Sequence, residues 1–270
     1  MTLRVPAAAA AVLVLALGAS ATELAPHRAY YDIKLKDSVW GAGITNLTGR
    51  LVVEFNNSCD GYTLNQRFVT ETSDSEGKVV ISDLWLTSWE SADGTSFRFN
   101  LKNEIDGTVV ESFNGKAAIA AKGQSGQVAY DGKEKKTADL PTGTIFPPEH
   151  ASDLVRAALA GDAFLSRTVF DGSGEGEVYS AHAVIGRERP AELAGGRLAQ
   201  IEGASAYSDA RAWPVTLSYY DAKSRLEMPD YESSFVMYSN GVSSDLVLDY
   251  GDFSVTGTLT RVEPLPAPKC

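Results

Sequence analysis

The chain has 270 residues, with 24 basic and 35 acidic side chains, so its formal net charge at neutral pH is −11. Such an acidic surface repels nucleic acid and anionic headgroups, because both are bound by clusters of Lys and Arg that this sequence does not contain. We therefore expect no nucleic-acid partner. The length is sufficient to bury a core and fits one large all-β domain or two small ones.

The N-terminus has the pattern of an export signal. Arg4 precedes an apolar run that ends at Leu17, and residues 19–21 are the small residues that signal peptidases recognise. We expect residues 1–21 to be a removed signal peptide and residues 22–270 to form a single exported domain. Without Arg4, 23 basic residues face 35 acidic ones, a net charge of −12. The apolar run is shorter than the roughly 20 residues that span a bilayer, so we expect no transmembrane segment.

Cys59 and Cys270 are the only cysteines of the chain. Export to an oxidising compartment makes a disulfide between them the default expectation. It would close a loop of about 210 residues, for which the loop-entropy model gives an upper bound of roughly 5 kcal/mol. The alternatives are two free buried thiols, or an intermolecular bridge through Cys270.

Short alternating segments and tight turns dominate the N-terminal half. The first predicted strand covers residues 28–36, where Tyr31, Ile33 and Leu35 alternate with polar residues. Segments 48–59 and 62–72 flank Asp60-Gly61, a strong hairpin signal because both turn positions favour positive φ. Similar pairs recur at 93–94, 106–107, 114–115, 131–132 and 240–241. Each such turn predicts a pair of antiparallel neighbours.

The pattern with period two continues toward the C-terminus. Further predicted strands cover residues 97–102, 178–186, 214–221, 234–239, 244–250 and 253–260. A dozen antiparallel strands must curl, close or fold into two layers, because long flat sheets with exposed edges are rare. We therefore predict an all-β, mostly antiparallel fold: a barrel or a strongly wound, barrel-like sheet. The proline-rich tail after the last strand would carry Cys270 back across the surface towards Cys59.

One segment has helical periodicity. Pro147-Pro148 favours a helix start, Leu154, Val155, Ala158 and Leu159 form an apolar stripe, and Gly161 favours the end. We expect this helix to pack against the sheet, where it could plug the mouth of a barrel. The acidic segment 171–177 that follows is predicted to be a solvated loop.

The sequence offers no clear catalytic or metal-binding constellation. His27, His150 and His182 are scattered, and no Gly-x-Ser-x-Gly elbow is present, so we predict no catalytic residue, no metal site and no cofactor. The alternative for the acidic segment is calcium binding by Asp171, Glu175 and Glu177.

Four residues are candidates for ligand contact: His150, Trp85, Trp89 and Tyr219. His150 lies at the predicted helix N-terminus on the apolar face, where burial and the helix dipole favour a neutral ring. It either packs in the core or contacts a ligand. Inward-pointing aromatic residues give either a filled core or an apolar groove for an acyl chain or peptide, and the sequence does not separate these outcomes.

Several motifs together resemble the EipB family of periplasmic cell-envelope integrity proteins of Gram-negative bacteria. They are Leu-Pro-Thr-Gly-Thr-Ile-Phe-Pro-Pro-Glu-His at 140–150, Val-Phe-Asp-Gly at 169–172, His-Arg-Ala-Tyr at 27–30 and Cys-Asp-Gly at 59–61. The resemblance covers nearly all of residues 22–270. It implies a monomer whose antiparallel sheet winds into a spiral, with a disulfide between Cys59 and Cys270, and a family with no established catalysis.

These observations lead to a functional hypothesis. The protein is expected to be non-catalytic, to act in the periplasm, and to support envelope integrity and outer-membrane homeostasis. It would do so by binding a lipid, a lipoprotein or a peptide on the concave side of its sheet, or by contacting periplasmic envelope proteins. The alternatives are a secreted hydrolase of envelope polymers that uses carboxylates near His150, and a protein-interaction scaffold that uses sheet edges.

Overall fold

The computed structural model describes residues 24–131, 136–174, 176–190, 198, 200–223 and 228–270. The predicted signal peptide lies outside the described residues. The described strands are β1 (His27–Ser38), β2 (Asn46–Ser58), β3 (Gly61–Ser73), β4 (Val79–Ser91), β5 (Ser96–Ile105), β6 (Thr108–Ile119), β7 (Gly126–Asp131), β8 (Lys136–Leu140), β9 (Thr144–Ile145), β10 (Phe164–Val169), β11 (Tyr179–Ile185), β12 (Ala212–Asp221), β13 (Tyr231–Tyr238), β14 (Ser243–Asp249) and β15 (Phe253–Pro264). The helices are α1 (Pro147–Ala160) and the short 3₁₀ helix η1 (Ala204–Tyr207).

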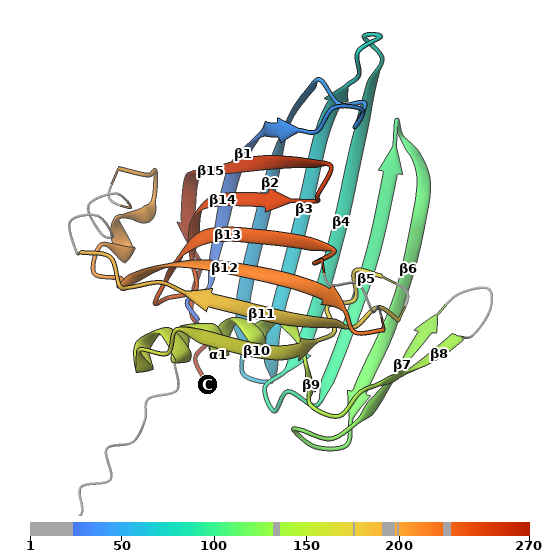
Figure 1. Cartoon of the computed structure of the whole chain (residues 1–270). Coiled ribbons are helices and arrows are strands. Elements are labelled where there is room, and N and C mark those ends of the chain that lie inside the picture. Colours follow the sequence, from blue (N-terminus) through green and yellow to red (C-terminus); the bar gives the residue numbers. More distant parts are fainter. Residues whose placement is uncertain (1–23, 132–135, 175, 191–197, 199, 224–227) are drawn as a thin grey trace, which may run out of the picture.

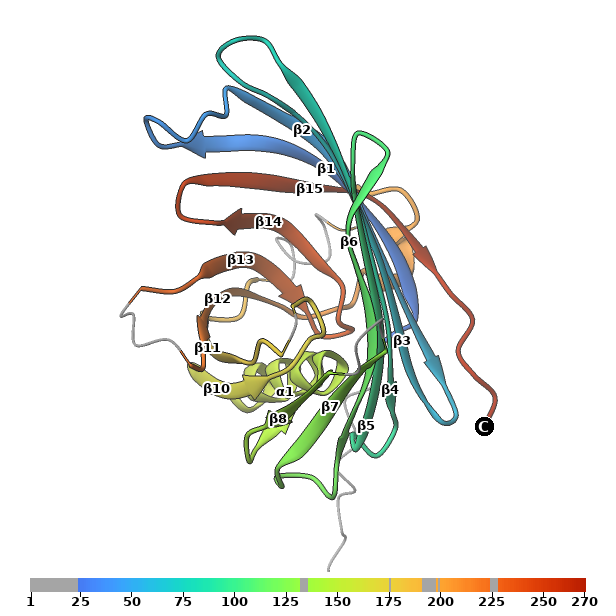
Figure 2. The same ribbon diagram turned by 90° about the vertical axis from the view of Figure 1, so that its right-hand side faces the viewer.

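All fifteen described strands belong to one sheet, in the order β8-β7-β6-β5-β4-β3-β2-β1-β15-β14-β13-β12-β11-β10-β9. Every neighbouring pair is antiparallel except β9 and β10, which run parallel. The first strand lies in the middle of the sheet, between β2 and β15. The sheet curls so that β10–β14 face the long strands β2–β5 with α1 between them (Figures 1 and 2). The predicted all-β, wound and barrel-like fold with one packed helix is confirmed.

Several predicted Gly turns form hairpins. Asp106-Gly107 joins β5 to β6 with both residues at positive φ, 50° and 75°. In contrast, the turn predicted at Asn114-Gly115 is wrong, because both residues lie inside β6 and pair with β5 and β7. Gly115 is required there by close packing, since a Cβ would lie 2.6 Å from the ring of Phe99. The pair at 131–132 extends outside the described residues.

The hairpin between β2 and β3 is present, but its turn consists of Cys59 and Asp60, neither at positive φ. Gly61 is the first residue of β3, where a Cβ would lie 2.1 Å from the carbonyl oxygen of Glu90. The glycine is thus needed for contact between strands and not for turn geometry. Cys59 forms a disulfide with Cys270, with the two Cα atoms 5.6 Å apart. The tail after β15 runs to the β2–β3 turn on the outside of the sheet (Figure 2).

Helix α1 begins and ends where the sequence predicts. Pro147 and Pro148 occupy its first turn, and Gly161 closes it at φ 83°. Its inner face packs in a cluster with Trp213, Leu217 and other residues of β11–β13. The residue before the helix, Phe146, is fully buried, and its ring stacks on Phe97 of β5 with centroids 4.9 Å apart. These contacts fix the helix inside the curled sheet.

The described part of segment 171–177 packs against the sheet, in contrast to the solvated loop that its acidic composition predicts, and of its described acidic residues Glu177 is exposed. Gly172, Gly174 and Gly176 are buried, and a Cβ on Gly172 would lie 2.6 Å from Phe99. The hydroxyl of Tyr130 donates to the carbonyl of Gly174 and accepts from the N–H of Gly176. The glycines therefore let the backbone pack against the aromatic cluster of β5–β7.

Candidate functional site: an interior cavity

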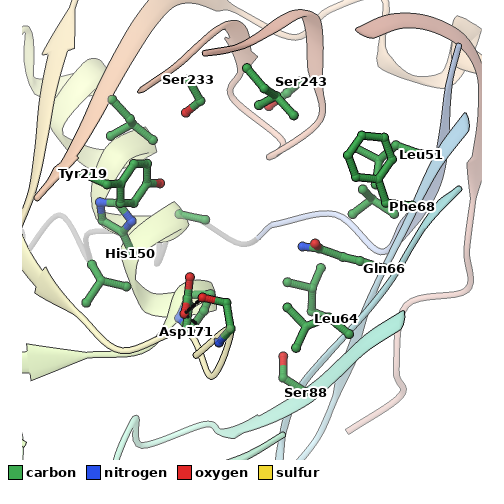
Figure 3. A pocket seen from close by; sticks show the side chains of 18 of the residues that line it. Leu51, Leu64, Gln66, Phe68, Ser88, His150, Asp171, Tyr219, Ser233 and Ser243 are labelled. Atoms are coloured by element: carbon green, nitrogen blue, oxygen red, sulfur yellow. Dashed lines mark hydrogen bonds between the residues drawn. The ribbon is translucent and has the colours of Figure 1, made fainter. Parts of the chain in front are cut away.

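The curled sheet encloses a cavity of about 650 Å³, a volume typical of sites that bind small molecules. One wall is mostly apolar and comes from β2–β5. Its apolar residues include Leu51, Leu64, Phe68 and Leu86, and its polar residues are Gln66, Ser88 and Asn103. The opposite wall comes from α1, the segment after β10, and β12–β14 (Figure 3). The sequence left open whether the interior is a filled core or a groove. The structure contains an open interior space.

Successive residues of β4 point to opposite faces of the sheet, so the candidate residues Trp85 and Trp89 do not face this cavity. Leu84, Leu86 and Ser88 line it, whereas the residues between them point to the other face of the sheet. There, the guanidinium carbon of Arg67 lies 4.8 Å from the ring centroid of Trp85. Arg98 lies 4.9 Å from that of Trp89. Trp85 and Trp89 are thus placed away from His150 and Tyr219, which both line the cavity.

Two tyrosines lie in the wall opposite β2–β5. Tyr219 of β12 and Tyr231 of β13 are register partners, and their rings stack at 12° with centroids 4.3 Å apart. Tyr179 packs edge-on against both. Burial is the main cause that raises the pKa of Tyr219 and of Tyr231. Both phenols are therefore neutral near pH 7 and available as hydrogen-bonding groups.

His150 lies in the first turn of α1, on the same side of the cavity as Tyr219 (Figure 3). Its side chain is buried, and its Nε2 has no hydrogen-bond partner among the described residues. Burial lowers the pKa of the ring to about 4, with Arg167 acting in the same direction and Asp153 opposing. The imidazole is neutral near pH 7. An unpartnered buried polar atom costs about 1–3 kcal/mol, which a hydrogen bond from a ligand would offset.

Asp171 brings a carboxyl group to the same side of the cavity (Figure 3). Its Oδ1 accepts hydrogen bonds from the backbone N–H of Ser173 at 2.9 Å and from the hydroxyl of Ser173 at 2.7 Å. Burial raises the pKa of Asp171, while the bonds from Ser173 oppose the shift. Among the described residues that line the cavity there is no Lys or Arg.

Sequence reasoning missed Asp171, Ser173 and Tyr231 as cavity residues. Asp171 was interpreted as part of a hydrated turn, although the repeated glycines at 172, 174 and 176 were a signal of close packing. Tyr231 became recognisable only from its register with Tyr219, which the sequence does not specify.

The described residues show no arrangement typical of a hydrolase or of a metal site. His182 bonds Ser166 and Ser180 at 2.8 and 3.1 Å on the outer face, and no acid orients it in these contacts. His27 bonds the carbonyl of Ala25. Over the described ranges, no group of three or more His, Cys, Asp or Glu side chains could hold a metal ion; Glu175, a candidate calcium ligand, lies outside them. Among the helices that the structure describes, none combines the length and apolarity needed to cross a membrane.

A barrel-like sheet wound around a largely apolar cavity defines a class of β-proteins with an interior space. The family model described as EipB-like matches residues 18–266, so the chain belongs to the EipB-like family, as its motifs predicted. The cell envelope integrity protein EipB of Brucella abortus (strain 2308) is 37% identical over 253 residues, which cover 92% of this chain and 87% of that protein.

A solved structure agrees with the fold. The crystal structure of a β-barrel-like protein of domain of unknown function DUF1849 from Brucella abortus is similar with a TM-score of 0.81 and 36% sequence identity. The similarity covers 90% of this chain and 99% of that chain.

Proposed function

We propose that this protein acts in the periplasm, without catalysis, and maintains the integrity of the cell envelope by holding the apolar chain of an amphiphile in its cavity. The amphiphile would be a lipid or the acylated end of a lipoprotein. The observation that carries the proposal is the cavity of about 650 Å³ with its apolar wall from β2–β5. The name of the Brucella relative supports the cellular role.

The strand pairing favours an acyl chain over an extended peptide. A peptide that adds to a sheet needs unpaired backbone groups at an edge. The strands β2, β3, β4 and β5 that form the apolar wall each have neighbours on both sides. The edges of the described sheet are β8 and β9, with five and two residues. The wall therefore offers side-chain contacts, which suit an aliphatic chain.

Filling the cavity tests the proposal in cells. In a strain that lacks the gene, the double variant Leu64→Trp/Leu86→Trp should fail to restore resistance to detergents and to antibiotics that the envelope excludes. The two indoles would occupy space between the walls and exclude an acyl chain. Colony counts on detergent plates measure the effect, and we expect a loss of at least about tenfold relative to wild type.

The matched control is Thr87→Trp, which adds an indole on the exposed face of β4, between Leu86 and Ser88. It should restore resistance fully. Both variants are compared only at equal periplasmic amounts and with retained melting transitions. Full rescue by the cavity-filled double variant would contradict the proposal.

A further inference from the structure

We infer that the cavity selects an amphiphile whose head is an ammonium group, held by Asp171 and the paired rings of Tyr219 and Tyr231, on the side of the cavity where His150 also lies. The inference rests on the proposed function, since it takes an apolar chain in the cavity as given, and it adds the charge of the head. Figure 3 shows His150, Asp171 and Tyr219 on one side of the cavity, opposite Leu64 and Phe68.

The charged side chains that line the cavity favour a cationic head. Its described lining has two carboxyl groups, Asp171 and the exposed Glu111, and no Lys or Arg. Arg167, which influences His150, is paired with Asp153 at 2.5 Å and does not line the cavity. A carboxylate or phosphate head would lose its hydration without gaining a counter-charge, whereas an ammonium head would gain one from Asp171.

The start of α1 does not supply an anion site. Helix N-termini usually bind anions through free N–H groups. Here the first two helical residues are Pro147 and Pro148, which have no N–H. The next N–H, that of Glu149, donates to the carboxyl group of Glu90 at 3.4 Å, and the N–H of His150 donates to the carbonyl of Phe146. The positive end of the helix therefore has no free donor for an anionic head in this turn.

The tyrosine pair favours a cation. Tyr219 and Tyr231 line the cavity together with Asp171, whose carboxyl group contributes to the raised pKa of both phenols. The faces of tyrosine rings carry negative electrostatic potential and attract cations, including quaternary ammonium groups. A ring pair beside a carboxyl group matches an ammonium head better than a neutral one.

His150 is a further polar residue on this side of the cavity. Its side chain is 6% exposed and lines the cavity, and its Nε2 is without a partner in the described structure. A neutral imidazole can accept an N–H through its unprotonated nitrogen. Because burial keeps the ring neutral near pH 7, it does not repel a cation. This nitrogen is itself covered by protein atoms, so the ring would have to rotate before Nε2 could accept an ammonium N–H from the cavity.

Isothermal titration with chain-matched ligands below their micellar concentrations tests the inference. The series is dodecylammonium, dodecyltrimethylammonium, the neutral glycerol monoester of dodecanoic acid, and dodecanoate, each added to the wild-type protein near pH 7. We expect dodecylammonium to bind at least about tenfold more tightly than the neutral ester, and dodecanoate to bind most weakly. Weaker binding of the trimethylated ligand than of dodecylammonium would support N–H donation to an acceptor in the cavity wall.

The variant Asp171→Asn should lose at least about tenfold in affinity for dodecylammonium and keep its affinity for the neutral ester. The amide retains an oxygen that accepts from Ser173, so the loop can keep its hydrogen bonds. The matched control, Glu76→Gln, removes the same charge from an exposed turn and should leave all four affinities unchanged. An equal loss in Glu76→Gln would show non-specific attraction to an acidic protein and overturn the inference.

A second pair of ligands separates two sources of the ammonium group. Tighter binding of a lysophosphatidylethanolamine than of the lysophosphatidylglycerol with the same chain would assign the head to a phospholipid. A preference for ammonium in the alkyl series alone would assign it to an amine without phosphate. If dodecanoate or the neutral ester binds most tightly, the inference is wrong and the proposed function stands. If no member of either series binds, both are wrong.

Discussion

Replacing Cys59 and Cys270 together by serine is expected to lower the free energy of unfolding by about 2–5 kcal/mol. The two residues are 211 positions apart, so the disulfide restricts the unfolded chain over most of the described sequence. It joins the β2–β3 turn to the tail that follows β15, and β15 pairs with β1 next to β2. Opening it should therefore loosen the middle of the sheet, where the N-terminal and C-terminal strands meet.

Urea unfolding of the double serine variant and of the oxidised wild type measures this loss. The wild type after reduction should match the variant, because both lack the same covalent link. The control is wild type treated with reductant and reoxidised, which should regain the original midpoint. Equal midpoints for the oxidised wild type and the double variant would contradict the expected role of the disulfide.

The second large effect is a fall in stability as the pH rises, caused by Glu90. This residue of β4 is 2% exposed, and its carboxyl group accepts the N–H of Glu149. Burial raises the pKa of Glu90 to about 8, and the charge of Glu149 adds to the shift, while its N–H and Lys122 oppose it. The proton is thus bound more tightly in the folded than in the unfolded state. This stabilisation is full below about pH 4.5 and is lost as the pH rises through about 8.

The variant Glu90→Gln should remove this part of the pH dependence. Its melting temperature should exceed that of the wild type at about pH 9, and its decline between about pH 5 and 9 should be shallower. Burial also raises the pKa of Asp171, which acts in the same direction as Glu90. Glu71→Gln on the exposed face of β3 is the control and should follow the wild type. A Glu90→Gln variant that loses stability as steeply as the wild type would contradict this assignment.

The sequence predicted the architecture because its local signals agree with the tertiary structure. Tyr31 and Ile33 alternate with polar residues, and both are buried in the central strand β1. Proline at the start and Gly161 at the end set the helix bounds. The turn predicted at Asn114-Gly115 is an exception. A glycine is required either by a turn or by a close contact, and at Gly115 the position of Phe99 decides for the contact.

The candidate site was less accessible from sequence. His150 could be found because it shares the apolar face of a helix whose bounds are clear. Trp85 and Trp89 could not be assigned to a face, because apolar or aromatic residues occupy both faces of β4 and only one faces the cavity. Asp171 was missed because its acidic neighbours suggest a hydrated loop, whereas the packing against Phe99 and Tyr130 brings it inside.

Native mass spectrometry of the protein isolated from the periplasm, beside the Leu64→Trp/Leu86→Trp and Thr87→Trp variants, tests the central claim most directly. The account predicts one bound amphiphile per chain in the wild type and in Thr87→Trp, and none in the cavity-filled variant. Wild type without added mass in material never exposed to detergent, or the same ligand retained after both indoles are introduced, would contradict it.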